Sequence, residues 1–526
     1  MTQSLSSGSS STSSLLSALT GSSSSSSSSS PTSTIGGNTG ALSSLGIGSG
    51  IDVNSIISAI MAADSQPLTD LQNTASSIQT KISTVGQLSS LMSTFQGAAS
   101  TLASPTFWDA TAATSSNTSV LTASTPDGTA QAGQYSVTVQ QLAQGQTATM
   151  STPVTDGNST FDSGTMTIQL GSWGTGTPPS FTAQANSNPV TLAISPTSNT
   201  LSDIAQQINS ANAGVTASII TDSTGSRLSL QSTSTGATSG FKITTTDDNP
   251  GAGPGPDLSS LSYDPSSGSS GLSLNLSAQN AMATVNGIPV QSSTNTLTGV
   301  TNGLNLTLQQ VSNTPVSVGV APDTATMTTA LNSFVSAYNA LNSAIRTDTA
   351  YNPSGPVAQG TSVQGGPLEG DPTVLSLQEQ MFSVFNVSST ASSTMHSLAD
   401  LGITIQGDGS LQTNSTKLAG ALQNPGAVKD LLTATGTGNA DTGLMVQFEN
   451  LGTQALGPGG LIAAEQSGLQ DQLKNNQQQQ TDMQTHLSNE QQTLTAQYEA
   501  LDTTMSQMNA LSSYVTQQET AWAKSG

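Results

Sequence analysis

The chain has 526 residues, no cysteine and a formal net charge of -22, from 8 Lys and Arg against 30 Asp and Glu. The missing cysteine excludes disulfides, thiolate metal sites and cysteine nucleophiles, and the sparse cations argue against nucleic acid as a partner, because phosphate binding needs clustered Lys and Arg. The length predicts several domains, and a charged fraction of only 7% favours a secreted, assembling protein over a cytosolic enzyme.

The N-terminal 43 residues are rich in serine, with an unbroken serine run over residues 22–30. Such a segment cannot bury enough apolar surface to fold, so we expect a disordered leader. It lacks the basic start and the continuous apolar stretch of a Sec signal peptide, so export would use another route. No apolar run reaches the roughly 18 residues of a membrane span.

Order is expected to begin near Leu45. Asp52 is the predicted N-cap of a helix through Ile56 and Ile60. Pro67 should interrupt this helix, and a longer helix should follow, because apolar residues recur at steps of three and four over residues 71–102.

From about residue 108 to residue 324 the apolar period changes to two, which predicts strands. Asn286-Gly287 between two alternating segments predicts a tight hairpin. Residues 304–308 and 316–320 are predicted to pair as another hairpin. A short helix over 201–211 interrupts the strands, and the Gly- and Pro-rich stretch 249–257 predicts a linker or long loop.

The helical period then returns. Apolar spacing predicts a helix over 327–345, and Asp371-Pro372 and Asn424-Pro425 predict the starts of two more. The last 58 residues carry a long apolar stripe from residue 469 to residue 515.

This order of elements predicts that the two helical ends pack together, because each end has one apolar stripe that needs a partner. Asn476 and Gln480 occupy two expected apolar positions of the C-terminal stripe and weaken it. The sequence therefore predicts a multidomain α+β fold, with a helical coiled-coil stalk built from both termini and two inserted β-rich head domains. The stalk is assigned to residues 44–107 and 325–526, one head domain to 108–145 with 277–324, and the second head domain to 146–276.

Motifs for catalysis or metal binding are weak. His396 and His486 lie in polar stretches and are interpreted as surface residues rather than zinc ligands or members of a catalytic triad. The glycines within 46–50 lack the Gly-Lys-Ser/Thr ending of a phosphate loop. The acidic residues at 247–248 and 408–409 lack a full calcium loop and are interpreted as turns. We expect no enzymatic activity, no cofactor and no metal.

Several short segments, taken in order, resemble one family. The N-terminal half contains SLGIGSGID at 44–52, QPL at 66–68 and GQYSVTV at 133–139, and the C-terminal half contains GPLEGD at 366–371, LGI at 401–403 and YEALD at 498–502. Together they resemble the flagellar filament cap family, also called hook-associated protein 2 or FliD. Residues 201–230 are similar to a repeat shared by flagellins and hook-associated proteins. The resemblance covers roughly residues 44–520.

This resemblance implies a homo-oligomeric ring of about four to six subunits at the distal tip of the flagellar filament. The implied role is to promote folding and insertion of exported flagellin, which filament elongation and motility require. The implied partners are copies of the chain, flagellin, and the flagellar type III export apparatus with an export chaperone. The implied location is extracellular, after secretion. The serine-rich leader is expected to belong to the export signal, and secretion of a chain lacking residues 2–40 would test that expectation.

The outermost helical segments, 44–70 and 490–526, are interpreted as flexible coiled-coil segments that order only in the oligomer. The alternative is an intramolecular coiled coil that is always folded. The predicted contacts for self-assembly and for flagellin are apolar residues of these segments: Ile51, Val53, Ile56, Ile60, Leu494, Leu501, Met505, Met508, Leu511 and Val515.

Two other functions stay open. A surface adhesin could bind mucin or other glycans through the β-rich head domains, and this role can coexist with a cap. The two terminal stripes favour the cap, since a simple adhesin does not need them. A third hypothesis is another axial component, such as a filament-junction protein, which would share the 201–230 repeat but not the signature at 44–68.

Overall fold

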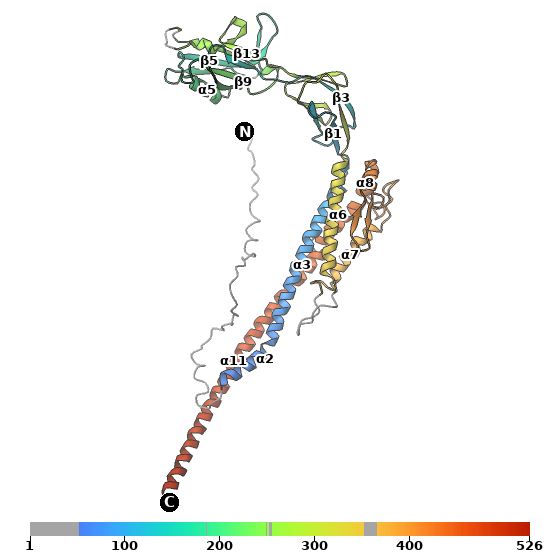
Figure 1. Cartoon of the computed structure of the whole chain (residues 1–526). Coiled ribbons are helices and arrows are strands. Elements are labelled where there is room, and N and C mark those ends of the chain that lie inside the picture. The colour runs from blue at the N-terminus through green and yellow to red at the C-terminus, as the bar shows by residue number, and fades with distance from the viewer. Residues whose placement is uncertain (1–51, 186, 249, 252–254, 352–364, 526) are drawn as a thin grey trace. The chain divides into compact units, whose positions relative to one another are not determined.

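The computed structural model describes residues 52–185, 187–248, 250–251, 255–351 and 365–525. The predicted disordered leader, the expected start of order near Leu45 and the candidate contact residue Ile51 lie outside these residues. The chain divides into a terminal unit, residues 1–79 with 471–526, and a central unit, residues 80–470. Helices flank a long run of antiparallel strands (Figure 1), which confirms the predicted multidomain α+β fold.

The N-terminal helices begin and end where polar caps and prolines require. Ser55 N donates to the Asp52 carboxylate at 3.1 Å, which caps the predicted first helix and satisfies one free N–H of its first turn. This helix ends just before Pro67, because proline is tolerated only in the first turn of the next helix. The elements are α2 (Val53–Asp64), α3 (Gln66–Ala103) and α4 (Pro105–Trp108).

The helices after the strands follow the same rules. The carboxylate of Asp371 accepts from the backbone N–H groups of Thr373 and Val374, at 2.9 and 3.1 Å, and Asn424 caps the helix that follows it. Both helix starts that were predicted from Asp-Pro and Asn-Pro are therefore confirmed. The elements are α6 (Thr324–Asp348), α7 (Pro372–Phe385), α8 (Ser415–Ala421), α9 (Pro425–Thr433), α10 (Leu444–Leu456) and α11 (Leu461–Ser525), with a small hairpin of β19 (Ile403–Ile405) and β20 (Leu411–Thr413).

An aromatic cluster joins four of these helices in the central unit. It contains one residue of α3, two of α6, one of α7 and one of α10, with ring centroids 5.0–5.9 Å apart: Phe95, Phe334, Tyr338, Phe385 and Phe448. The predicted stripe of α6 forms its support, since every member from Met327 to Ile345 is buried. The cluster fastens a helix that precedes the strands to helices that follow them.

The first β domain packs two antiparallel sheets against each other around one apolar core. The five-stranded sheet has the order β1 (Thr111–Ser115), β18 (Val316–Pro322), β3 (Gly133–Gln141), β14 (Ala281–Val285), β15 (Ile288–Ser292). The three-stranded sheet has the order β16 (Thr296–Thr301), β17 (Leu304–Leu308), β2 (Leu121–Ser124). Asn286 and Gly287 have φ of 50° and 80°, which is the geometry of the predicted hairpin turn between β14 and β15.

The predicted hairpin of residues 304–308 with 316–320 is wrong. β17 pairs with β16 and β2, whereas β18 pairs with β1 and β3 in the other sheet. Both strands do bury alternate side chains in the shared core, as their period of two predicts. The chain crosses between the sheets at 309–315 instead of turning back within one sheet.

The second β domain also has two antiparallel sheets, here with a helix. One sheet has the order β12 (Ser269–Ser270), β11 (Tyr263–Asp264), β10 (Gly240–Asp247), β5 (Gly164–Trp173), β6 (Phe181–Ala183), with β7 (Val190–Ile194) also paired to β5. The other has the order β13 (Leu272–Leu276), β4 (Thr147–Met150), β9 (Gly225–Ser232), β8 (Val215–Asp222). The predicted short helix is α5 (Leu201–Ser210).

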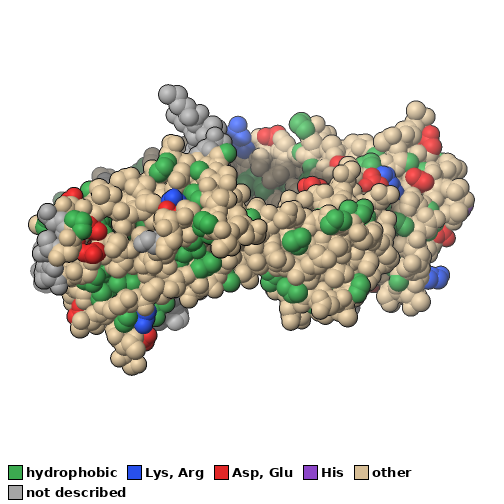
Figure 2. Space-filling view, turned by 90° about the horizontal axis from the view of Figure 1, so that it is seen from above, with side chains coloured by type: hydrophobic (Ala, Val, Ile, Leu, Met, Phe, Trp, Pro, Cys, Tyr) green, Lys and Arg blue, Asp and Glu red, His purple; other side chains and the backbone are tan. Residues whose placement is uncertain are grey.

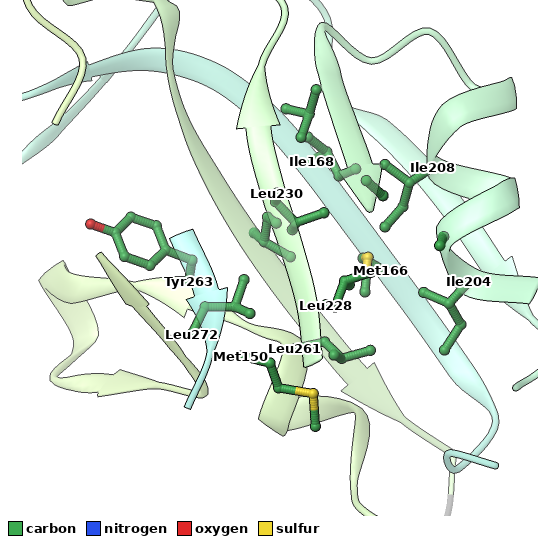
Figure 3. Packing of buried hydrophobic residues seen from close by; sticks show 14 of the residues in the cluster. Met150, Met166, Ile168, Ile204, Ile208, Leu228, Leu230, Leu261, Tyr263 and Leu272 are labelled. Atoms are coloured by element: carbon green, nitrogen blue, oxygen red, sulfur yellow. The ribbon is translucent and has the colours of Figure 1, made fainter. Parts of the chain in front are cut away.

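The core of this domain lies between α5 and the strands. Figure 3 shows Ile204 and Ile208 of α5 directed toward Met166 and Ile168 of β5 and toward the leucines of β9, all of them buried. The described residues of the stretch 249–257 belong to no helix or strand, in keeping with a loop.

One buried carboxyl group stands out near this core. Asp162 precedes β5, and its pKa is raised above the ordinary value by burial, by a hydrogen bond with the Asp257 carboxyl, and by the charges of Asp257 and Asp247. The folded domain therefore holds this proton more tightly than the unfolded chain does. The protonated carboxyl of Asp162 therefore stabilises the folded domain at pH values below the ordinary pKa. This contribution is lost as pH rises through the raised pKa of the folded state.

Phe448→Ala should lower the free energy of unfolding by about 3–5 kcal/mol, because it leaves a cavity where four aromatic rings meet. Urea unfolding followed by circular dichroism measures this loss. Tyr351→Ala, at a side chain that is 67% exposed, is the control and should leave the transition unchanged. Equal small effects of the two substitutions would contradict the role of the cluster.

Asp162→Asn should raise the unfolding temperature near neutral pH, since the amide keeps the side chain neutral, and the gain should shrink toward about pH 4. Asp222→Asn is the control and should lower the unfolding temperature near neutral pH. A hydrogen bond from Thr224 lowers the pKa of Asp222, so the fold is stabilised by the charged carboxylate that this substitution removes. Thermal unfolding of the full chain at both pH values makes the comparison. A gain for Asp162→Asn that grew as pH fell would contradict the assignment.

Candidate self-assembly site

The predicted assembly segments lie in the terminal unit, where α2 and the start of α3 run antiparallel to α11. Gln480 Nε2 donates to the Leu71 carbonyl at 3.3 Å. Further along α11, residues 484–491 share a pocket of about 420 Å³ with Met61, Ser65 and Leu68. Residue numbers rise on α11 while they fall on its partner, so α11 forms an antiparallel helical pair with α2 and the start of α3 (Figure 1).

A polar contact is buried in the seam between these helices. Asn476 is 6% exposed, and its Oδ1 accepts a 2.6 Å hydrogen bond from Gln480 Nε2. Gln480 in turn reaches the backbone of α3 at Leu71. A buried polar residue in a coiled-coil seam fixes the register of the helices and lowers stability. The two residues that interrupt the predicted apolar stripe therefore have a structural partner.

The apolar stripe of α11 continues beyond its partner helix. Figure 1 shows α11 running past the N-terminal end of α2. The repeat is seven residues long, which is typical of a left-handed coiled coil. Its members are Leu487, which is 9% exposed, Leu494, which is partly buried, and then Leu501, Met508, Val515 and Trp522, which are 47%, 60%, 53% and 73% exposed. The stripe passes from covered to exposed along one helix.

The structure separates the candidate contact residues into two groups. Val53 is 2% exposed, and Ile56 and Ile60 are partly buried, so the apolar side of α2 packs within its own chain. On α11, Leu494 and Met505 are partly buried, whereas the remaining four are exposed: Leu501, Met508, Leu511 and Val515. All described candidates are helical in the single chain. Their role in self-assembly and flagellin contact, and ordering only in the oligomer, stay predictions.

Two exposed aromatic residues of the same surface were missed from the sequence. Tyr514 is 59% exposed and Trp522 is 73% exposed. Trp522 stands seven residues after Val515, so the heptad spacing could have identified it. We call Leu501, Met508, Leu511, Tyr514, Val515 and Trp522 the tail stripe.

Few ionised groups accompany the tail stripe. Between residues 490 and 523 the charged residues are all acidic: Glu490, Glu499, Asp502 and Glu519. Glu490 lies 3.6 Å from His486 on the preceding turn. Contact of this helix with another protein would therefore depend on apolar burial rather than on ion pairs.

Other chemistry has little support in the described residues. No three His, Asp or Glu side chains among them are arranged to hold a metal ion. His396 is engaged locally, with Nδ1 2.9 Å from the Ser389 carbonyl and its backbone N donating to Asp400. Within the same part of the chain, no helix has the length and apolarity needed to cross a membrane.

Comparison with family models matches most of the chain. Residues 49–146 match the model described as the flagellar hook-associated protein 2 N-terminus, and residues 278–510 match its C-terminus. Residues 180–234 match the flagellin hook IN motif.

Known proteins of similar sequence and structure agree with these matches. Flagellar hook-associated protein 2 of Escherichia coli K12 is 32% identical over 485 residues, which cover 91% of this chain and 98% of the relative. The B-type flagellar hook-associated protein 2 of Pseudomonas aeruginosa is 30% identical, covering 87% and 92%. A crystal structure of the D1-D2-D3 domains of the flagellar cap protein FliD from Escherichia coli has a TM-score of 0.55 at 31% identity, covering 74% of this chain and 99% of that chain.

The double variant Asn476→Leu, Gln480→Leu should unfold at a higher temperature than the unchanged chain, because replacing both partners of a buried polar contact is neutral or stabilising. It should also broaden the distances between spin labels on α2 and α11, since the seam loses its register contact. Thermal unfolding and pulsed electron resonance measure the two effects. A more stable variant with one sharp distance would contradict a role in register.

Proposed function

The chain belongs to the flagellar hook-associated protein 2 family, and on this premise we propose that it caps the distal tip of the flagellar filament. Copies of the chain form a ring of about four to six subunits. The ring promotes folding and insertion of flagellin subunits as they leave the export channel, so the filament cannot elongate without it. The protein is secreted through the flagellar type III export apparatus, with an export chaperone, and acts outside the cell.

The tail stripe is the observation that carries this proposal. Full burial of one Leu, Val or Met side chain contributes about 1.5–3 kcal/mol relative to leaving it exposed. Several such side chains, exposed along one face of a helix with few charges, therefore favour a further partner. A second copy of the chain and flagellin are the proposed partners.

The physical character of the stripe suits a moving cap. Apolar contact is non-directional and depends mainly on the area buried. The same helix can therefore bind sites that are not equivalent as new subunits are added. Ion pairs would restrict it to one geometry, and this helix has few of them.

The test compares two variants of the same helix. Leu501→Ser, Met508→Ser, Leu511→Ser and Val515→Ser together remove the apolar surface. Thr503→Ser, Gln507→Ser and Gln517→Ser are the matched control among uncharged polar residues. Light scattering measures the mass of each purified chain across a concentration series, and electron microscopy measures filament length in cells that carry only that variant.

We expect the unchanged chain and the control to form a discrete oligomer and to support long filaments. The four-serine variant should stay at lower mass and leave filaments short. Full-length filaments in cells without the protein would refute the cap function itself. Normal assembly and elongation by the four-serine variant would refute the part given to the tail stripe.

Adhesion to mucin or other glycans through the head domains is a second candidate function. One feature favours it, which is a pocket without charged side chains in the second β domain. A cap can carry this function as well, because the pocket and the tail stripe use different residues.

A further inference from the structure

A buried carboxylate oxygen of the second β domain receives no hydrogen bond. Asp162 is 8% exposed, and its Oδ2 is buried with no donor in the described part of the chain. Burying a polar atom without a partner costs free energy, and the cost is larger for a group that carries charge. This oxygen atom therefore points to a ligand as its partner.

Two further carboxyl groups face the same oxygen. The Asp257 carboxyl lies within hydrogen-bonding reach of Asp162, and Asp247 is close enough for its charge to act on Asp162. Asp257 Oδ1 accepts from Gly251 N at 3.0 Å, and Asp247 Oδ1 accepts from Leu258 N at 2.8 Å. Each of these carboxylates is thus held by one oxygen and can bind a ligand through the other.

The core of the domain holds the three acidic residues in place. Asp162 lies between the buried Phe161 and strand β5, and Asp247 is the last residue of β10. Asp257 stands just before Leu258, which is fully buried. Ligating groups carried on packed segments lose little conformational freedom when an ion binds.

The cationic side chains of this domain are paired with other acids. Residues 146–276 contain one Arg and one Lys. Arg227 pairs with Asp222, and Lys242 pairs with Asp264. Figure 2 shows Lys and Arg as a few scattered residues on the face that it draws, several of them beside an acidic side chain. A cation from solution is therefore the counter-charge that the group around Asp162 can gain.

We propose that Asp162 and Asp257 bind a calcium ion. No three acidic side chains of the described ranges converge on one ion, so these two carboxylates are the direct ligands and Asp247 contributes through its charge alone. Calcium accepts about six to eight oxygen ligands in irregular geometry, so water and backbone carbonyls can supply the others, whereas magnesium demands a near-ideal octahedron. Two direct carboxylates predict a dissociation constant of roughly 0.1–1 mM, as in extracellular calcium-binding modules.

The two proposed ligands are distant in the chain. The calcium loops that can be recognised in a sequence are contiguous, so the sequence-based expectation of no metal does not test this site. The inference is also independent of the proposed cap and of adhesion. It uses neither the tail stripe nor any residue that lines the pocket of the second β domain.

Calorimetric titration of the full chain with calcium chloride, after removal of metal by a chelator, measures binding and its stoichiometry. Asp162→Asn and Asp257→Asn each remove the charge of one ligand with little change of shape. Asp222→Asn is the matched control, because Asp222 lies in the same domain but pairs with Arg227. We expect one calcium ion per chain, with affinity lowered about tenfold or more in both ligand variants and unchanged in the control.

Thermal unfolding of the full chain provides a second test, in which the sign of one effect reverses. In chelating buffer near neutral pH, Asp162→Asn should unfold at a higher temperature than the unchanged chain, because it removes a buried charge. At a calcium concentration about tenfold above the dissociation constant, the unchanged chain should unfold at the higher temperature, because an ion that binds only the folded state stabilises it. Magnesium chloride at the same concentration, and sodium chloride at the same ionic strength, should have much smaller effects.

Several results would overturn the proposal. One is that the unchanged chain binds no calcium. Another is that magnesium or sodium chloride stabilises it as much as calcium does, which would indicate general screening of the net charge of -22. Loss of binding in Asp222→Asn with retention in Asp162→Asn would place the ion elsewhere. An Asp162→Asn variant that unfolds above the unchanged chain in calcium as well as in chelator would show that no ion pairs with this carboxylate.

Discussion

Contact among five aromatic rings is the interaction on which the central unit depends. The whole chain has 9 Phe, 6 Tyr and 3 Trp, and five of these residues meet in one cluster. The cluster joins Phe95 to residues 334–448, so it fastens together the two ends of the inserted strands. These aromatic residues therefore meet where the helix before the strands contacts the helices after them. Loss of the cluster would weaken the packing of the helices that hold the two β domains.

Local signals in the sequence were sufficient for most elements of the fold. The caps at Asp52, Asp371 and Asn424 and the turn at Asn286-Gly287 depend on neighbouring residues only, and each is where the sequence predicts it. Sheet membership is different. The alternation in β17 and β18 shows that each strand buries one face, but it carries no information on which sheet each strand joins. The predicted hairpin failed for that reason.

The candidate site shows the same division between local and distant information. The heptad spacing of α11 can be read along one helix, and it extends to Trp522. The contrast between buried Val53 and exposed Leu501 cannot be predicted from one helix alone, because it depends on where α2 ends beside α11. The sequence also does not predict the partner of Gln480, since Leu71 is distant in the chain and contributes only a backbone carbonyl.

The tail stripe and the pocket of the second β domain share a low content of charged side chains. Both surfaces offer apolar area beside uncharged polar groups, so neither depends on attraction between charges. Salt screens interactions between exposed charges and leaves apolar burial largely intact. Contacts made by such surfaces should persist over a wide range of ionic strength, as the proposed position at the filament tip would require.

The buried contact of Asn476, Gln480 and Leu71 also sets a length. Because α2 and α11 run antiparallel, their register decides how much of α11 extends beyond α2. A slip by one heptad would move the tail by about 10 Å, at 1.5 Å of rise per residue. The polar contact near one end of the helical pair therefore determines how far α11 extends beyond α2 at the other end.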